Sequence, residues 1–176
     1  MAVMPLWSTV DAQGTLCQTG APPAESRPFL QATGLLLPPL ISELHQSFHA
    51  WQVAGLAPGP VTPERLWITP AGGLSVRFAD GEHPRALPPV GAHAGLAAWL
   101  VLLDKWVETF VVVARARSVW TPGELAGALS FTTPSLLPAT LMQTPPDNWE
   151  QVAIALARAV AEGPLPGTPT NRHWSK

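Results

Sequence analysis

The fold is decided by residues 55–80, which have the sequence GLAPGPVTPERLWITPAGGLSVRFAD. Three prolines in the first part, Pro58, Pro60 and Pro63, exclude a helix, because each fixes φ and removes a backbone donor. Residues 66–69 are apolar and partly β-branched, residues 70–73 favour a turn, and apolar side chains alternate with others over residues 74–79. This pattern predicts a loop followed by a β-hairpin with one buried face.

The same stretch resembles the catalytic-loop region of bacterial serine/threonine protein kinases. In that family a helix runs into Gly-hydrophobic-x-His-x-Asp-Leu-x-Pro-Glu-Asn, and a strand, a turn and Asp-Phe-Gly follow. Residues 55–65 match the first motif in register, and the resemblance covers about residues 35–117 when the flanking helices are included. It implies a truncated, degenerate kinase C-lobe.

The residues that carry kinase chemistry are replaced in this chain. Pro58 stands where the family has His, Pro60 where it has the catalytic Asp, and Arg65 where it has the magnesium-binding Asn. The metal-binding Asp of the second motif falls on or next to Phe78, and Asp80 takes its place only if the strand slips by two residues. Phosphoryl transfer needs a carboxylate to orient the hydroxyl and oxygen ligands for Mg²⁺, which proline and a guanidinium do not provide. The resemblance therefore implies a pseudokinase-like protein with no catalytic residues, cofactor or metal.

Helical periodicity predicts the elements on either side of this stretch. Apolar residues recur with helical spacing over residues 35–51, where prolines 38 and 39 suit a first turn. We expect one central buried helix over residues 96–116, the most hydrophobic part of the chain. Its Asp104, Lys105 and Glu108 form a narrow polar strip, which we interpret as solvated charges opposite an apolar stripe that includes Phe110.

Further along the chain, two capping boxes predict helix starts. They are Thr121–Glu124, whose helix should run to about Leu129, and Asp147–Glu150, whose helix should end at Gly163. Between them, residues 131–146 are rich in Thr and Pro and predict a loop with one helical turn near residues 136–142.

These elements predict an α+β fold that is mainly helical, carries two short β-hairpins and resembles a truncated kinase C-lobe. The expected organisation is an N-terminal hairpin (1–20), a Pro/Ala linker (21–34), one mainly helical domain (35–163) and a disordered tail (164–176).

Composition limits the function classes. Only 12% of residues are charged and the net charge is -2, which gives no electrostatic reason to expect nucleic acid. The charges in residues 96–114 argue against a membrane span. The start of the chain lacks the basic and apolar pattern of a signal peptide, and the single Cys17 suits a reducing compartment, so we expect a cytoplasmic protein.

Histidines provide the candidates for a metal or ligand site. His45 and His49 are four residues apart on a predicted helix, but we interpret them as polar-edge residues that pack beside Trp51. His83 and His93 share a Gly/Pro-rich region with acidic residues at 80 and 82, and Asp80, Glu82, His83 and His93 are the residues of an alternative metal- or ligand-binding site.

We therefore expect a non-catalytic protein–protein interaction subunit or adaptor of a bacterial multiprotein complex. The chain is Trp-rich, and the candidate exposed tryptophans are Trp7, Trp67, Trp120 and Trp174. One alternative is a small metal- or ligand-binding enzyme with the acidic and histidine site described above. A second alternative, an accessory subunit of a nucleic-acid-processing complex, is disfavoured by the acidic balance.

Overall fold

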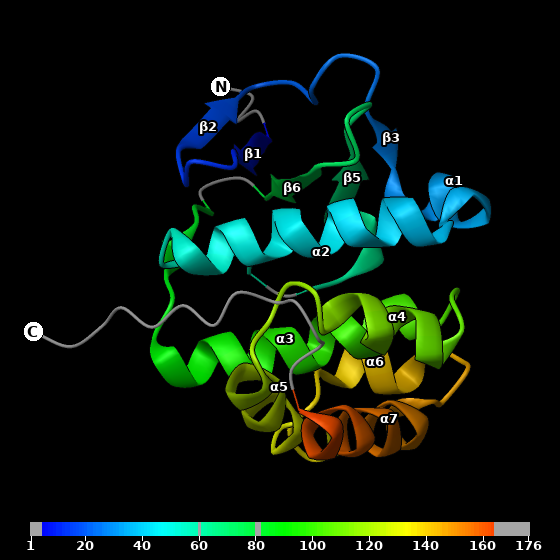
Figure 1. The fold of residues 1–176 in the computed structure, drawn as a ribbon. Helices are drawn as coiled ribbons and strands as arrows, with labels where there is room; N and C mark the ends of the chain where they lie inside the picture. Colours follow the sequence, from blue (N-terminus) through cyan, green and yellow to red (C-terminus); the bar gives the residue numbers. More distant parts are fainter. Residues whose placement is uncertain (1–4, 60, 80–81, 164–176) are drawn as a thin grey trace, which may run out of the picture.

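The computed structural model describes residues 5–59, 61–79 and 82–163 and shows an α+β fold in layers, in which helix α2 (Pro38–Val53) separates a sheet from a group of helices (Figure 1). The strands of this sheet are β1 (Leu6–Val10), β2 (Leu16–Thr19), β3 (Arg27–Pro28), β5 (Leu66–Ile68) and β6 (Leu74–Phe78). All neighbouring strands are antiparallel, in the order β2-β1-β6-β5-β3. The group of helices comprises α3 (Pro89–Asp104), α4 (Thr109–Ala116), α5 (Pro122–Leu129), α6 (Ala139–Gln143) and α7 (Trp149–Glu162). The predicted α+β class is confirmed.

The predicted N-terminal hairpin is formed by β1 and β2, with Val10 opposite Leu16. The Asp11 carboxylate closes the turn because it accepts hydrogen bonds from the backbone N–H groups of Gln13 at 2.9 Å and Thr15 at 2.8 Å. Strand β1 also pairs with β6, so the hairpin is part of the main sheet.

The second predicted hairpin is formed by β5 and β6, and its turn is fixed by a glycine. Gly72 has φ +80°, a conformation that favours glycine. A Cβ at this position would lie 2.8 Å from Cβ of Glu43 on α2. The turn therefore packs closely on the helix because residue 72 has no side chain.

In the sequence, the β5–β6 hairpin lies between the two strands of a second, two-stranded sheet. Strand β4 (Leu56–Ala57) pairs antiparallel with β7 (Arg85–Ala86), while the short helix η2 (Pro63–Arg65) leads into β5. The ends of the segment that contains the predicted loop and hairpin are thus held together.

Residues 21–34 were predicted to be a linker, and the structure corrects this. They contain β3, helix α1 (Phe29–Ala32) and most of the 3-10 helix η1 (Thr33–Leu35). Because β2 and β3 are opposite edges of the sheet, the chain between them passes from one edge to the other (Figure 1). A two-residue strand has no periodicity of its own, and its partner β5 is distant in sequence, so the pattern alone could not reveal it.

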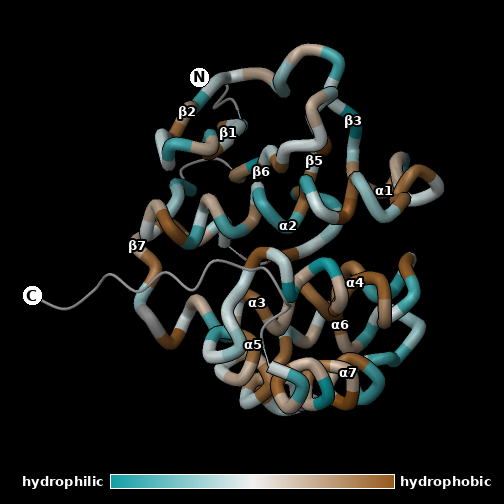
Figure 2. Tube along the Cα trace, in the orientation of Figure 1, coloured by the Kyte–Doolittle hydropathy of each residue, from teal (hydrophilic) through white to brown (hydrophobic). Residues whose placement is uncertain are grey.

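Helix α2 carries the core between the layers. It begins at Pro38, as predicted, and its Ile41, Leu44, Phe48 and Trp51 are fully buried. Along α2 the tube in Figure 2 alternates between hydrophobic and hydrophilic residues, as expected for a helix with buried and exposed faces. Phe48 stacks on Trp99 of α3 with ring centroids 4.8 Å apart, which joins the middle and lower layers.

The single helix predicted over residues 96–116 is wrong. It is interrupted after Asp104, and α4 starts again at Thr109. Lys105 is buried and its ammonium donates to the carbonyls of Thr144 and Pro146, so the expectation of a solvated charge is wrong for Lys105, whereas Glu108 is exposed as predicted. The break turns Phe110, which we expected in the core, into a side chain that is 66% exposed.

The two capping boxes have different outcomes. Thr121 and Glu124 form both bonds of the box at the start of α5, as predicted. The box at 147–150 is wrong, because Asn148 is the residue before α7 and makes no side-chain cap bond. Its amide instead donates to the carboxylate of Asp104, an acid that we expected to face solvent and that is buried.

Across the described ranges of the chain, none of the helices combines the length and apolar character needed to span a bilayer.

Candidate functional site

Two of the loop positions singled out from the sequence, Arg65 and Phe78, line a small hollow between η2, β6 and β7. The hollow measures about 170 Å³ and is lined by Ala57, Gly59, Arg65, Phe78, Glu82, His83 and Arg85. Among the predicted loop positions Pro58 and Phe78 are buried. Pro60 and Asp80 lie outside the described residues.

Arg65 organises this hollow. Its Nε donates to the carbonyl of Arg77 at 3.1 Å, and its Nη2 forms an ion pair with the Glu82 carboxylate. The guanidinium also lies over the Phe78 ring, 5.4 Å from the centroid, in a cation–π arrangement. We call Arg65, Phe78 and Glu82 the arginine cluster.

Glu82 is held by two donors in this cluster. Its carboxylate accepts the backbone N–H of Ala79 at 3.1 Å in addition to the bond from Arg65. The Ala79 N–H, together with the Arg65 guanidinium, lowers the pKa of Glu82 below its usual value. A carboxylate engaged in this way already serves as an internal counter-ion.

The alternative metal- or ligand-binding site is divided by the structure. Glu82 and His83 line the hollow of the arginine cluster, whereas His93 lies on α3 and lines a different hollow with His49 and Glu124. His93 packs directly on a glycine of α5, since a Cβ at Gly127 would lie 2.6 Å from its ring. Within the described ranges, no three His, Cys, Asp or Glu residues are grouped as a metal site would require.

His45 and His49 have separate environments. His45 is fully buried, accepts at Nδ1 from the Trp99 indole at 3.0 Å and contacts the Val112 carbonyl through Nε2 at 3.0 Å. Burial lowers the pKa of His45 to about 4. The expectation of a polar-edge residue is thus wrong for His45, while His49 is only partly buried and lies 4.0 Å from the Glu124 carboxylate.

The candidate exposed tryptophans that the structure describes are buried or half-buried, in keeping with the simpler interpretation of most of them as core or edge residues. Trp7 and Trp120 are buried, and Trp174 lies outside the described residues. Trp67 is half-buried and packs edge-on against Trp7 with ring centroids 4.6 Å apart. Trp120 donates from its indole to Gln52 at 2.8 Å. Sequence alone could not separate an exposed from a buried tryptophan, because the covering elements come from distant parts of the chain.

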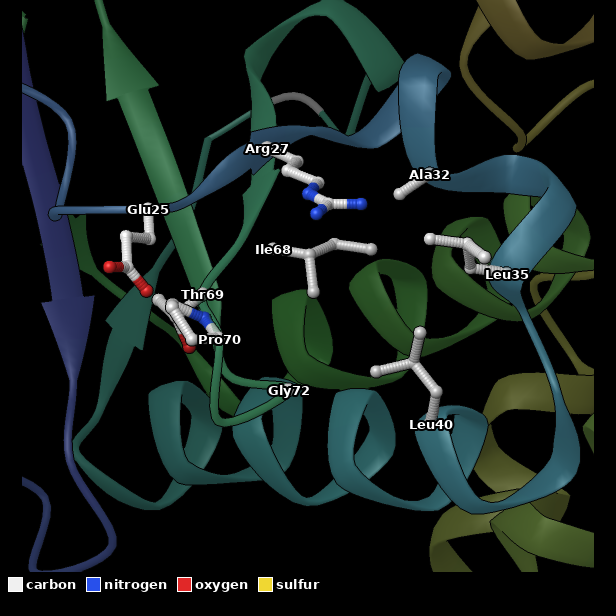
Figure 3. A pocket seen from close by; sticks show the side chains of 9 residues that line it. All are labelled: Glu25, Arg27, Ala32, Leu35, Leu40, Ile68, Thr69, Pro70 and Gly72. Atoms are coloured by element: carbon white, nitrogen blue, oxygen red, sulfur yellow. The ribbon is translucent and has the colours of Figure 1, made fainter.

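Three exposed leucines were not predicted from the sequence. Leu30, Leu35 and Leu37, all near the start of α2, are 47%, 50% and 65% exposed. Leu35 also lines a hollow of about 340 Å³ (Figure 3), together with Glu25, Arg27, Ala32, Leu40, Ile68, Thr69, Pro70 and Gly72. In Figure 3 the side chains of Leu35, Leu40, Ile68 and Arg27 point into this space from different elements. We call the three leucines together with this hollow the leucine surface.

The three leucines of the leucine surface lie in an uncharged stretch of the chain. No charged residue occurs from position 28 to position 42, although longer runs without Asp, Glu, Lys or Arg occur at 44–63 and 125–146. Buried residues explain only part of it, because Leu30, Leu35 and Leu37 remain exposed. Exposed apolar side chains beside a hollow are typical of a protein contact surface.

The chain matches no family model, no curated protein and no solved structure.

Proposed function

We propose that this protein is a non-catalytic, pseudokinase-like interaction subunit or adaptor of a bacterial multiprotein complex, and that the leucine surface is where its partner binds. The observation that carries the proposal is the exposure of Leu30, Leu35 and Leu37 in a segment without charge, where Leu35 also lines the hollow. Covering large apolar side chains with a partner removes them from water and stabilises the complex.

The arginine cluster supports the non-catalytic part of the proposal. Helix α2, the segment with β4 and η2, and the β5–β6 hairpin cover the residues that resemble the kinase pattern. At the position of the magnesium ligand stands a guanidinium that is bonded to Glu82 and packed on Phe78. A guanidinium has no acceptor atom to offer a divalent cation, and Phe78 offers no ligand oxygen.

The leucine surface also suggests the chemistry of the partner. Arg27 points into the hollow from β3, and Glu25 lies at its rim (Figure 3). The partner should therefore insert an apolar side chain near Leu35 and Leu40 and present polar groups to the charged rim. We place this complex in the cytoplasm, in keeping with an exposed free thiol at Cys17.

Affinity purification from the native host with quantitative mass spectrometry tests the proposal. The double variant Leu35→Glu/Leu37→Glu places two charges on the leucine surface, and Ile154→Glu on α7 is the matched control, since Ile154 is also 50% exposed. We expect a reproducible partner that co-purifies with the wild type and the control but is depleted at least tenfold with the double variant. Equal recovery with all three proteins would contradict the assignment of the surface.

A further inference from the structure

We infer that strand β2 is a dimerisation edge, at which the sheet continues into the β2 strand of a second copy of this chain about a two-fold axis at Cys17. This inference is independent of the leucine surface, because β2 and β3 are opposite edges of the sheet and the hollow of the leucine surface lies beside β3.

The two edges of the sheet differ in their protection. Edge strands of monomeric proteins are usually short, charged or interrupted by proline, which prevents pairing with another chain. Strand β3 follows this rule, because it has only two residues, Arg27 and Pro28. Strand β2 has four residues with the sequence LCQT, without charge or proline, and Cys17, Gln18 and Thr19 are exposed.

The register of the hairpin shows which backbone groups face the open edge. Asp11 N–H donates to the Thr15 carbonyl at 3.1 Å, so this is a hydrogen-bonded pair, and such pairs recur at every second residue of an antiparallel ladder. The backbone groups of Cys17 and Thr19 therefore face β1. Those of Leu16 and Gln18 face outward.

This arrangement is self-complementary. If two β2 strands pair antiparallel with Cys17 opposite its own copy, Leu16 of each chain lies opposite Gln18 of the other. Each of these two residue pairs can exchange both of its N–H···O=C bonds, giving about four interchain hydrogen bonds. Every outward-facing backbone group of β2 is then satisfied, which is the property of an isologous two-fold contact.

Side chains at this edge are compatible with the pairing. The strand brings no charge to the axis, so no like charges are opposed. Leu16 is only partly buried in the single chain, and a neighbouring strand would cover more of its side chain. A second copy presents the same outward-facing groups of Leu16 and Gln18, so the two edges satisfy each other about the axis at Cys17.

The register gives a sharp cross-linking test. Cys17 and its copy would form a non-hydrogen-bonded pair with Cα atoms about 4.5 Å apart, within the range of about 4.4–6.8 Å that a disulfide can bridge. We expect the full-length protein to form a covalent dimer when thiols are oxidised with copper phenanthroline. With Cys17→Ser in the background, the pair Thr15→Cys/Thr19→Cys should also cross-link, because residues 15 and 19 are opposite in this register. Thr19→Cys alone should not, since its copy would be roughly 13 Å away along the strand.

A backbone substitution tests the non-covalent dimer. Gln18→Pro removes an N–H that faces the open edge and leaves the pairs with β1 intact, and proline is tolerated at such edge positions. Gln18→Ala, which keeps the N–H, is the control. Under reducing conditions, sedimentation equilibrium at high protein concentration should show dimers for the wild type and Gln18→Ala. Gln18→Pro should sediment as a monomer with an unchanged circular dichroism spectrum.

Three results would overturn the inference. They are a monomeric wild type at every concentration, a dimer that survives Gln18→Pro, and cross-linking of Thr19→Cys alone at the rate of the Thr15/Thr19 pair. A monomer that still captures its partner through the leucine surface would refute the dimer and leave the proposed function in place. If the dimer is intact but no partner is captured through the leucine surface, the proposed function is refuted and the dimer inference remains.

Discussion

The indole nitrogen of Trp99 donates a hydrogen bond to Nδ1 of His45 over 3.0 Å, deep in the core between α2 and α3. An Nδ1 that accepts a bond carries no proton, so the proton of this neutral imidazole is on Nε2, which donates to the Val112 carbonyl. Both ring nitrogens are thus committed to bonds that connect three helices. His45 is a structural residue whose neutral form is required by the fold.

The first prediction follows from the pKa of His45, which is about 4 in the folded protein against an ordinary value of 6.5. Above pH 6.5 the residue is neutral in both states and the free energy of unfolding does not depend on it. As the pH falls from 6.5 towards 4, the unfolded chain binds a proton that the folded chain does not, and stability is lost. The loss should reach roughly 3 kcal/mol, at 1.36 kcal/mol per pKa unit.

Urea unfolding of the wild type and of His45→Gln between pH 4 and pH 8 measures this effect. The glutamine keeps a donor and an acceptor but does not titrate, so its unfolding free energy should depend less on pH below 6.5. Identical pH profiles for the two proteins would show that His45 is not the responsible group.

The second prediction concerns Asp104, whose carboxylate receives the Asn148 amide in a buried position. Burial raises the pKa of Asp104, while bonds from Thr109 and Asn148 oppose the rise. A raised acid pKa means that stability falls as the pH rises from the unfolded towards the folded value, and at neutral pH the desolvation cost of the carboxylate remains. Asp104→Asn should therefore be as stable as the wild type or more stable at pH 8.

Asp104→Ala provides the contrast, because it leaves the buried amide of Asn148 without its acceptor. We expect this variant to lose about 1–3 kcal/mol. Thermal unfolding of both variants at pH 8 checks the pair of predictions, and an asparagine variant as unstable as the alanine variant would contradict them.

The third prediction concerns Gly72 in the turn between β5 and β6. Gly72→Ala adds a Cβ at positive φ and 2.8 Å from Glu43, so it should destabilise the protein by about 1–3 kcal/mol. Gly34→Ala is the control, since no neighbouring atom lies within 4 Å of its added Cβ. The denaturant midpoints of the two variants are compared, provided that their m-values are equal. Similar midpoints would argue against close packing of the turn on α2.

The elements that the sequence predicted correctly are those specified by neighbouring residues. The two hairpins have alternating strands around turn residues, α2 has prolines in its first turn, and α5 has a complete capping box at Thr121. In each of these cases the signal lies within a few residues of the element. Local chemistry is therefore sufficient to place them.

The elements that the sequence missed depend on distant partners. The break after Asp104 is fixed by Asn148 and by the carbonyls that bind Lys105, and β3 exists only because β5 lies beside it. From sequence alone, a buried charged residue in a hydrophobic helix cannot be distinguished from a solvated one until its buried partner is known. The leucine surface was missed because, in the sequence, exposed apolar residues near a helix start look the same as core residues.

Calorimetric titration of the wild type with ATP and Mg²⁺ tests the central proposal, that the loop whose sequence resembles a kinase catalytic loop holds a structural arginine cluster and no nucleotide site. The account predicts no saturable heat for the wild type at millimolar nucleotide, and none for Arg65→Asn, whose loop still lacks the other ligands. Saturable binding with a dissociation constant below about 1 mM, lost when Glu82 or Arg65 is replaced by alanine, would contradict it.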